Sequence, residues 1–445
     1  MEKLAGTPAA LEARARAVVA SMAAPDARKA AQEFVAQAGR DAAIQLEACV
    51  HCGQCAGACH FHIVTGDPRH TPVYKLRPML KAYRRERAPF STVRRLLGLA
   101  PAELSAQELT AWSELLYDSC NLCGRCTLVC PMGIDIAGLV RRAREAMSAA
   151  GFAPADLYTA AQRALDTGSP IGLGWPALRR QIELQEAETG LKVPVDVAGA
   201  EYLVILSSME IIGYPEIIGA LARIFSRAGV SWTLPSAGFE ATNVGVQLGS
   251  RDVAAALVSR IVDAAERLKV KCVISPECGH AYTALRWEGP NLLGRAYAFK
   301  VVQIAELLEQ LVREGRLRTN GKDARRLTFH DPCQIVRRGG VTGAPRRLMG
   351  GVSGNFVEMP APGAASFCCG GGGVSAIHRA EKLRFAAFDC KKRQIDATGA
   401  EALVTSCANC RNVLEEAIDE YGMVLPVLGL TELVAQYLEP EAGPR

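Results

Sequence analysis

Five cysteines in the last third of the chain have a spacing that could hold a metal centre. In the order C…CC-G…C-x-x-C they are Cys333, Cys368, Cys369, Cys407 and Cys410. Two adjacent cysteines cannot both be ordinary core residues, because neighbouring side chains point to opposite faces of a strand and diverge by about 100° around a helix. The four glycines at 370–373 permit positive φ angles and let the backbone approach a bulky inorganic ligand. We therefore interpret this set as a metal site, against the alternative of small buried hydrophobic residues.

Two further groups of cysteines have the spacing C-x2-C-x2-C-x3-C, which is typical of bacterial two-cluster ferredoxins. In this motif three thiolates of one turn bind one [4Fe-4S] cubane, and the fourth binds the other cubane. The predicted ligands are Cys49, Cys52, Cys55 and Cys130 for cluster one, and Cys120, Cys123, Cys126 and Cys59 for cluster two. Zinc also takes four thiolates, but two complete copies of the ferredoxin spacing disfavour it.

One residue departs from the ferredoxin pattern. His60 follows Cys59, where the pattern usually has proline. An imidazole there can change hydrogen bonding or solvent access at cluster two, and so change its reduction potential. We expect His60 and His62 to be packing residues rather than further ligands.

Length and composition bound the class of protein. With 445 residues, 49% hydrophobic and 22% charged, the chain is typical of a globular protein of several domains. The net charge of +5 is mild, and no interleaving of basic and aromatic residues supports nucleic-acid binding. We find neither the apolar region of a signal peptide nor an apolar run that predicts a transmembrane helix. We expect a cytoplasmic protein, or one lying peripherally on the inner face of the cytoplasmic membrane, whose 16 cysteines serve metal or redox chemistry.

The segment between the two ferredoxin motifs is long and contains a basic stretch. Between positions 75 and 95 the only acid is Glu86, and the cations are Lys75, Arg77, Lys81, Arg84, Arg85, Arg87, Arg94 and Arg95. This stretch is either a solvated helix face or a docking surface for an acidic partner or an anionic membrane leaflet.

The elements that must position the cysteines change character along the chain. Apolar spacing predicts helices over 1–48 and again over 134–200. From about residue 201, short apolar strands alternate with amphipathic helices, which predicts an α/β region with a mostly parallel sheet. The expected strands are 203–206, 272–274 and 327–330, and the expected helices are 215–228 and 253–268.

The α/β pattern repeats, because 327–330 matches 203–206 and 402–410 matches 270–278. Only the second copy keeps all five cysteines; the first retains Cys278 and has Ser275 where Cys407 would fall. We predict a multi-domain α+β fold, in which a helical two-cluster ferredoxin domain precedes two repeated α/β domains. The expected parts are an N-terminal helical segment (1–40), a ferredoxin-like domain with a helical insertion (41–150), a helical linker (151–200), a degenerate α/β domain (201–320) and an intact α/β domain (321–445).

Two ferredoxin motifs followed by paired C…CC-G…C-x-x-C units resemble the heterodisulfide reductase catalytic family over roughly residues 45–440. The degenerate first repeat is most similar to the K subunit of the dissimilatory-sulfite-reductase membrane complex. In this family the repeats are cysteine-rich (CCG) domains. The resemblance implies that one non-cubane [4Fe-4S] cluster is held by Cys333, Cys368, Cys369, Cys407 and Cys410.

The resemblance also implies a function. The chain would carry out disulfide or trisulfide redox chemistry at the C-terminal cluster, as an oxidoreductase subunit in sulfur metabolism. Two cubanes would connect that cluster to a membrane cytochrome or other quinone-linked subunit. A small cysteine-bearing sulfur-carrier protein would be the substrate partner, and further iron–sulfur or flavin subunits are compatible. The alternative is a pure electron-transfer subunit of a flavin-dependent hydroxyacid dehydrogenase of the glycolate or lactate type. A third is a scaffold with structural zinc.

Cys278 has two interpretations. It is either the buried, inert thiol of a decayed repeat or a residue that reaches the intact site as a ligand or substrate-thiol partner, and we include it in the candidate catalytic set. Its neighbours Glu277 and His280 are candidate proton carriers, since histidine titrates near neutral pH, although we expect structural hydrogen bonding for both. We expect supporting roles for His330 and Asp331, and structural roles for Cys272 and Cys390.

Overall fold

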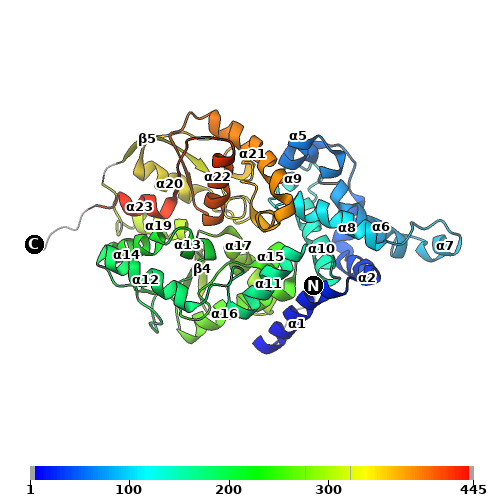
Figure 1. The fold of residues 1–445 in the computed structure, drawn as a ribbon, viewed down its shortest axis with the longest axis horizontal. Coiled ribbons are helices and arrows are strands. Elements are labelled where there is room, and N and C mark those ends of the chain that lie inside the picture. The colour runs from blue at the N-terminus through cyan, green and yellow to red at the C-terminus, as the bar shows by residue number, and fades with distance from the viewer. Residues whose placement is uncertain (1–5, 276, 321, 440–445) are drawn as a thin grey trace, which may run out of the picture.

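The computed structural model describes residues 6–275, 277–320 and 322–439, so the outer ends of the first and last expected domains lie outside the described residues. The fold is rich in helices and contains two small parallel sheets, which confirms the predicted mixed character. In Figure 1 the ferredoxin-like helices lie on the right, the second sheet and its helices lie above, and the first sheet lies below.

Three helices precede the first cysteine motif, as the sequence predicts. They are α1 (Pro8–Ala20), α2 (Ala27–Gln37) and α3 (Arg40–Glu47). Helix α2 begins at an Asp26 cap, whose carboxylate accepts from the backbone N–H groups of Arg28 and Lys29. Helix α1 packs away from the cysteines, and Arg14 bonds Asp252 of the first α/β unit at 3.0 Å.

Seven helices build the region of the two ferredoxin motifs. They are α4 (Gln54–Ala58), α5 (His60–Thr65), α6 (Arg77–Glu86), α7 (Ser91–Leu96), α8 (Ala106–Ser113), α9 (Arg125–Leu128) and α10 (Ile136–Ala149). Helices α4 and α9 follow Gly53 and Gly124, whose φ angles of 79° and 77° favour glycine. Each glycine follows the second cysteine of its motif, so the same turn is built twice.

Residues 151–200 form two helices that pack onto the first α/β unit. They are α11 (Ala155–Thr167) and α12 (Trp175–Thr189). Helix α11 contacts α15 and α16, and α12 contacts α14. The segment expected to be a linker therefore forms an additional layer over the first sheet.

The first sheet is four-stranded and parallel, with the order β2-β1-β3-β4. Its strands are β1 (Tyr202–Val204), β2 (Trp232–Thr233), β3 (Cys272–Ser275) and β4 (Lys300–Gln303). Its helices are α13 (Ser208–Ile212), α14 (Glu216–Ala228), α15 (Val244–Leu248), α16 (Arg251–Arg267), α17 (Gly279–Tyr282), α18 (Gly289–Leu293) and α19 (Ile304–Arg313).

The second sheet has the same strand order and direction, β6-β5-β7-β8. Its strands are β5 (Asp323–His330), β6 (Ser353–Phe356), β7 (Ala402–Thr405) and β8 (Val427–Gly429). Its helices are α20 (Gly343–Val352), α21 (Glu381–Asp396), α22 (Ala408–Glu420) and α23 (Leu430–Gln436). In each sheet the first strand of the unit lies between the second and the third.

Alternate residues of β3 face two different cores, as the period of a strand requires. Val273 belongs to a core that also contains the ferredoxin-like helices, whereas Ile274 belongs to a core shared with the second sheet. The segments that follow β3 and β7 meet, because the N–H of Ala408 donates to the carbonyl of Glu277 at 2.7 Å. The first α/β unit thus contacts both other parts of the molecule.

Candidate metal centres

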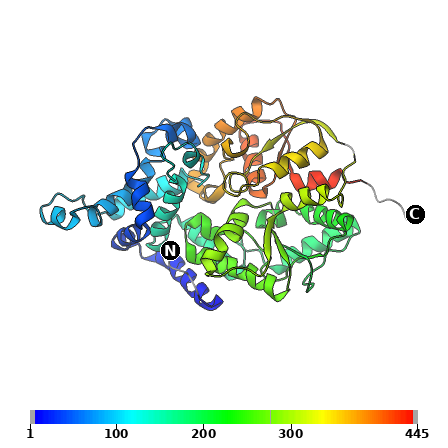
Figure 2. The ribbon, with the colours of Figure 1, turned by 180° about the vertical axis from the view of Figure 1, so that it is seen from behind.

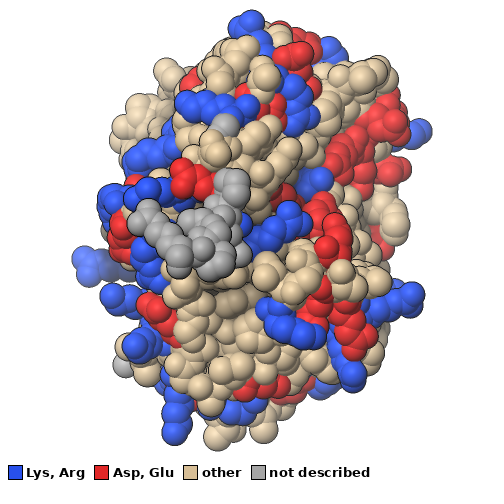
Figure 3. Space-filling view, turned by 90° about the vertical axis from the view of Figure 1, so that its left-hand side faces the viewer, with Lys and Arg blue, Asp and Glu red and all other residues tan. Residues whose placement is uncertain are grey.

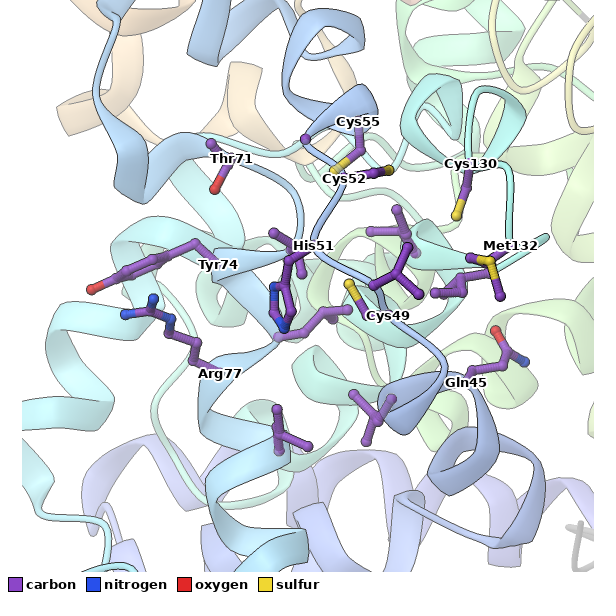
Figure 4. Close-up of a pocket in the computed structure, with 18 of the residues that line it drawn as sticks. Gln45, Cys49, His51, Cys52, Cys55, Thr71, Tyr74, Arg77, Cys130 and Met132 are labelled. Carbon is purple, nitrogen blue, oxygen red and sulfur yellow. The ribbon is translucent and has the colours of Figure 1, made fainter.

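The four cysteines predicted for cluster one lie around a single cavity of about 700 Å³. Figure 4 shows Cys49, Cys52 and Cys55 on the first motif and Cys130 reaching the same cavity from the second. Cys52 is exposed, so the cavity opens to solvent at this thiol. Burial raises the pKa of Cys55, and the nearby thiols Cys49 and Cys130 raise it further.

The cations Arg77, Lys81 and Arg84 also line the cluster-one cavity, and no carboxylate is among its described lining residues. Four thiolates around iron carry net negative charge, which Arg77 can offset. Lys81 and Arg84 are paired with Glu108 at 2.6 Å and Glu47 at 3.3 Å. A sulfur-only donor set without carboxylates fits an iron–sulfur cluster and is unsuited to Mg²⁺ or Ca²⁺.

The four cysteines predicted for cluster two line a second, enclosed cavity of about 30 Å³. They are Cys59, Cys120, Cys123 and Cys126. Burial raises the pKa of Cys123 to about 12, and burial followed by the charges of the neighbouring thiols raises that of Cys126. A bound cluster would remove the need to hold buried protons on these thiols. The structure thus brings together both crossed ligand sets that the spacing predicts.

The unusual histidine after Cys59 is buried and hydrogen-bonded. His60 Nε2 bonds Asn121 Oδ1 at 2.8 Å, and burial lowers the pKa of His60. His62 bonds the carbonyl of Asp67 at 3.0 Å through Nδ1. Both histidines therefore make structural hydrogen bonds in this structure.

The five C-terminal cysteines also line one cavity, about 20 Å³ in volume. They come from three places: Cys333 follows β5, Cys368 and Cys369 lie in the loop before α21, and Cys407 and Cys410 begin α22. The Sγ atoms of Cys333 and Cys368 are 3.9 Å apart, and those of Cys369 and Cys410 are 3.3 Å apart. The structure therefore gathers all five predicted ligands around one point.

Hydrogen bonds among these thiols raise the pKa of some and lower the pKa of others. The bond between Cys333 and Cys368 raises the pKa of Cys333 and lowers that of Cys368. The bond with Cys410 lowers the pKa of Cys407 to about 7, aided by backbone N–H groups at the start of α22. Thiolate character is needed for iron binding, and the arrangement favours it at two of the five sulfurs.

The glycines beside these cysteines are required by close approach. Gly370 and Gly372 have φ angles of 98° and 66°, and a Cβ on Gly371 would meet Asn409 Nδ2 at 2.9 Å and Cys369 Sγ at 3.3 Å. A side chain at Gly371 would have to displace the Asn409 amide and would crowd Cys369 Sγ. The glycine run thus wraps the sulfur atoms closely, as a large inorganic ligand requires.

His330 ends β5 beside these sulfurs. It is fully buried, and neither ring nitrogen has a hydrogen-bond partner among the described residues. One of its ring nitrogens and the Sγ atoms of Cys369 and Cys410 all lie within 4.8 Å of one another. Asp331 instead points away and pairs with Arg346 at 2.8 Å. His330, Cys369 and Cys410 together offer one imidazole and two thiols that could hold a metal ion.

Cys278 occupies the same position in the first unit as Cys407 in the second, which corrects the expected match of Ser275 to Cys407. Ser275 instead corresponds to Thr405, since each ends the third strand of its unit. Each is extended and caps the helix after the third strand, with φ/ψ of −135°/110° and −147°/112°. The two segments meet, since the Gly279 backbone bonds Cys407, and burial and the Cys407 charge raise the pKa of Cys278. His280 lines the five-cysteine cavity. The structure therefore places the Cys278 segment against the intact site.

The remaining two cysteines lie apart from the three cavities. Cys272 is buried in β3 and Cys390 is buried in α21, and neither lines any of the three cavities described above. Both positions agree with the structural roles expected from the sequence.

Sequence reasoning did not single out Asn121, Gln334 or Arg337, which join cluster two to the five-cysteine site. The Asn121 amide donates to the carbonyls of Gly370, at 2.8 Å, and Gly371. Gln334 donates to the Leu122 carbonyl at 3.1 Å. Arg337 donates to the carbonyl of Cys123 at 2.8 Å and also to those of Ala364 and Ser366. The positions of Asn121 next to Cys120 and of Gln334 next to Cys333 were the available signals, whereas Arg337 lies in no recognisable motif.

No helix in the described part of the chain is both long enough and apolar enough to cross a membrane.

Comparison with known proteins identifies two domains. Residues 45–134 match the 4Fe-4S dicluster domain, and residues 327–415 match the cysteine-rich CCG domain. An Hdr-like menaquinol oxidoreductase iron-sulfur subunit of Archaeoglobus profundus is 26% identical over 88% of this chain and 79% of its own length. One subunit of the dihydromethanophenazine:CoB--CoM heterodisulfide reductase of Methanosarcina barkeri is 26% identical over 89% of this chain and 94% of its own length. The EtfAB:quinone oxidoreductase of Syntrophomonas wolfei is 26% identical over 84% of this chain and 55% of its own length.

Proposed function

We propose that this chain interconverts a disulfide or trisulfide and thiols at its five-cysteine site. It is a heterodisulfide-reductase-like iron–sulfur oxidoreductase subunit with a ferredoxin domain and a CCG domain. Two cubanes, on the Cys49 and Cys120 motifs, carry the electrons singly. Cys333, Cys368, Cys369, Cys407 and Cys410 hold a non-cubane [4Fe-4S] cluster, which supplies iron for a substrate sulfur. The proposed domains keep the boundaries 1–40, 41–150, 151–200, 201–320 and 321–445.

The observation that carries this proposal is the direct contact between the second ferredoxin turn and the five-cysteine site. The charges of Cys123 and Cys368 act on each other, and Cys123 also acts on Cys333. Arg337 fixes the distance by bonding the Cys123 carbonyl from the segment just after Cys333. Thiol groups of cluster two thus lie beside thiol groups of the site, so a short route for electrons supports a redox reaction there.

The reaction balances with two electrons and two protons for each S–S bond that becomes two thiols. Burial raises the pKa of Glu277 to about 8, so this carboxyl holds a proton at neutral pH beside Cys407. Burial lowers the pKa of His280 to about 4, so this imidazole is neutral beside the cavity that it lines. The site therefore contains a proton donor for reduction.

The partner on the electron-supply side meets cluster one. This cavity is the open one of the two ferredoxin sites, with Cys52 exposed and Arg77, Lys81 and Arg84 along its wall. A membrane cytochrome or other quinone-linked subunit with an acidic surface fits these cations. The relative named as a menaquinol oxidoreductase subunit supports such a partner. A small sulfur-carrier protein with a cysteine is the proposed partner at the other end.

Electron paramagnetic resonance of the anaerobically purified, oxidised protein tests the proposal. We expect glutathione disulfide, its trisulfide or the free thiol to change the signal of the C-terminal cluster. Cys333→Ala should abolish this change, whereas Cys390→Ala, which removes a buried thiol of the same unit outside the cavity, should preserve it. A wild-type spectrum that none of these compounds alters would reject disulfide chemistry at this site.

A second candidate function is a relay that passes electrons between a flavoprotein and quinone. The similarity to an EtfAB:quinone oxidoreductase favours it, as does the enclosed five-cysteine cavity of about 20 Å³. In this case reduced flavoprotein should drive reduction of a quinone analogue, and Cys278→Ala, which removes the thiol against Cys407, should leave that rate unchanged. Co-purification with a flavoprotein of the hydroxyacid dehydrogenase type would select this function.

A further inference from the structure

An arm made of residues 84–100 projects from the ferredoxin-like region. It comprises the end of α6, helix α7 and the loop that follows, and Figures 1 and 2 both show α7 at the far end, away from the two sheets. Five large apolar side chains of the arm are exposed, namely Phe90, Val93, Leu96, Leu97 and Leu99. Phe90 and Leu96 are 80% and 83% exposed, far beyond what a solvated surface helix needs.

The arm is folded even though its apolar side chains face outward. The N–H of Leu99 donates to the carbonyl of Arg94 at 2.7 Å, which closes the end of α7. Arg95 pairs with Glu86 at 2.6 Å, and Arg85 donates to the Pro101 carbonyl at 2.7 Å. These hydrogen bonds within the arm and its base hold the apolar residues in an outward position.

Basic side chains are interleaved with the apolar ones. Residues 84–99 contain five arginines and one acid, Glu86. Arg87 and Arg94 form no ion pair with any described residue. The opposite end of the molecule differs, because there Figure 3 shows acidic and basic side chains interspersed. The arm therefore combines exposed apolar area with an excess of positive charge.

We propose that the arm inserts into the surface of an anionic lipid bilayer. Val93, Leu96 and Leu97 have the spacing of one helix face, so the arm combines an exposed apolar face with arginines, a pattern that suits the headgroup region of an anionic bilayer. Arginines can bury their carbon chains while their guanidinium groups bind lipid phosphates. The occupant is thus lipid, and a membrane subunit is the competing outcome of the test.

Insertion of the arm would also bring cluster one to the membrane. Helix α6 carries Arg77, Lys81 and Arg84 on the wall of the cluster-one cavity and continues directly into the arm. Lipid binding requires no electron transfer and no sulfur substrate, so the inference goes beyond the proposed function and can fail or hold independently of it.

Vesicle flotation with the full, anaerobically purified chain tests the inference. We expect the wild type to float with vesicles of phosphatidylglycerol and phosphatidylcholine, and to float less with phosphatidylcholine alone or at high salt. The double variant Leu96→Glu/Leu97→Glu should lower the partition coefficient roughly tenfold or more, since two leucines lose their transfer from water. Val424→Glu is the matched control, because Val424 is at least as exposed but lies in the second α/β unit.

Iron content and the resonance spectrum should be the same in all three proteins, which shows that the arm variant is folded. Wild-type protein that stays with the soluble fraction overturns the proposal, and binding only to proteoliposomes that contain a membrane partner would assign the arm to that partner instead. Equal binding by the double variant, or an equal loss in the Val424 variant, also overturns it.

Discussion

Replacing Asn121 should most clearly weaken the contact between the ferredoxin region and the five-cysteine site. Its amide bonds the carbonyls of Gly370 and Gly371, and its carbonyl accepts from His60. All of these groups are buried. Asn121→Ala would leave two buried carbonyls and one imidazole nitrogen without partners, at about 1–3 kcal/mol for each group that water does not reach.

Water reaches some of these groups in the variant, so we expect Asn121→Ala to lower the free energy of opening the glycine loop by about 3 kcal/mol. This corresponds to a roughly hundredfold larger population of the open loop. Hydrogen exchange followed by mass spectrometry measures this locally, without the assumption that a chain of several domains unfolds in one step. The amides of a peptide spanning 367–374 should exchange roughly a hundredfold faster in Asn121→Ala than in wild type.

The matched control is Asn412→Ala, because the Asn412 amide donates to Glu416 at 2.7 Å on the exposed side of α22. This variant should leave exchange of the loop unchanged. If Asn121→Ala changes exchange of the loop by less than about threefold, the hydrogen bonds do not hold the loop and the reasoning is wrong.

Three further predictions follow from the same structure. Cys130→Ala should remove the cluster-one signal and Cys59→Ala the cluster-two signal in spectra of the reduced protein; loss of the opposite signals would disprove the crossed ligand sets. Burial raises the pKa of Glu210 to about 8. Between about pH 4.5 and 8 the folded chain holds a proton that the unfolded chain releases, so the thermal midpoint should fall as pH rises, and more steeply than in Glu210→Gln. Cys278→Ala should alter the C-terminal cluster signal because this thiol lies against Cys407, whereas Cys272→Ala should not.

The local parts of the site could be predicted from the sequence because short spacings limit where thiols can go. The C-x2-C-x2-C turn holds three cysteines of one motif together, so the fourth must serve elsewhere, and Cys130 indeed lies with Cys49. Strand and helix periods predicted the α/β units, since buried strands such as 272–275 read as continuous apolar runs.

The contacts between distant parts of the chain could not be predicted in this way. Asn121 and Gly371 are 250 positions apart, and nothing in either local pattern specifies that their polar groups will pair. The packing of 151–200 onto the first sheet depends likewise on which apolar faces meet. The unpartnered state of His330 follows from the exact fit of neighbouring side chains, which a single sequence does not reveal.

The different enclosure of the three sulfur sites has a consequence for how firmly each bound group is retained. Cys52 remains exposed in the folded chain, so iron can reach or leave cluster one without a change in fold. Cys123 is enclosed between its own turn and Arg337, and the Asn121 bond seals the glycine loop against it. Groups held at the two inner sites would therefore be retained by the contacts between the ferredoxin region and the C-terminal unit. The group at the outermost site would be the first to exchange with solvent.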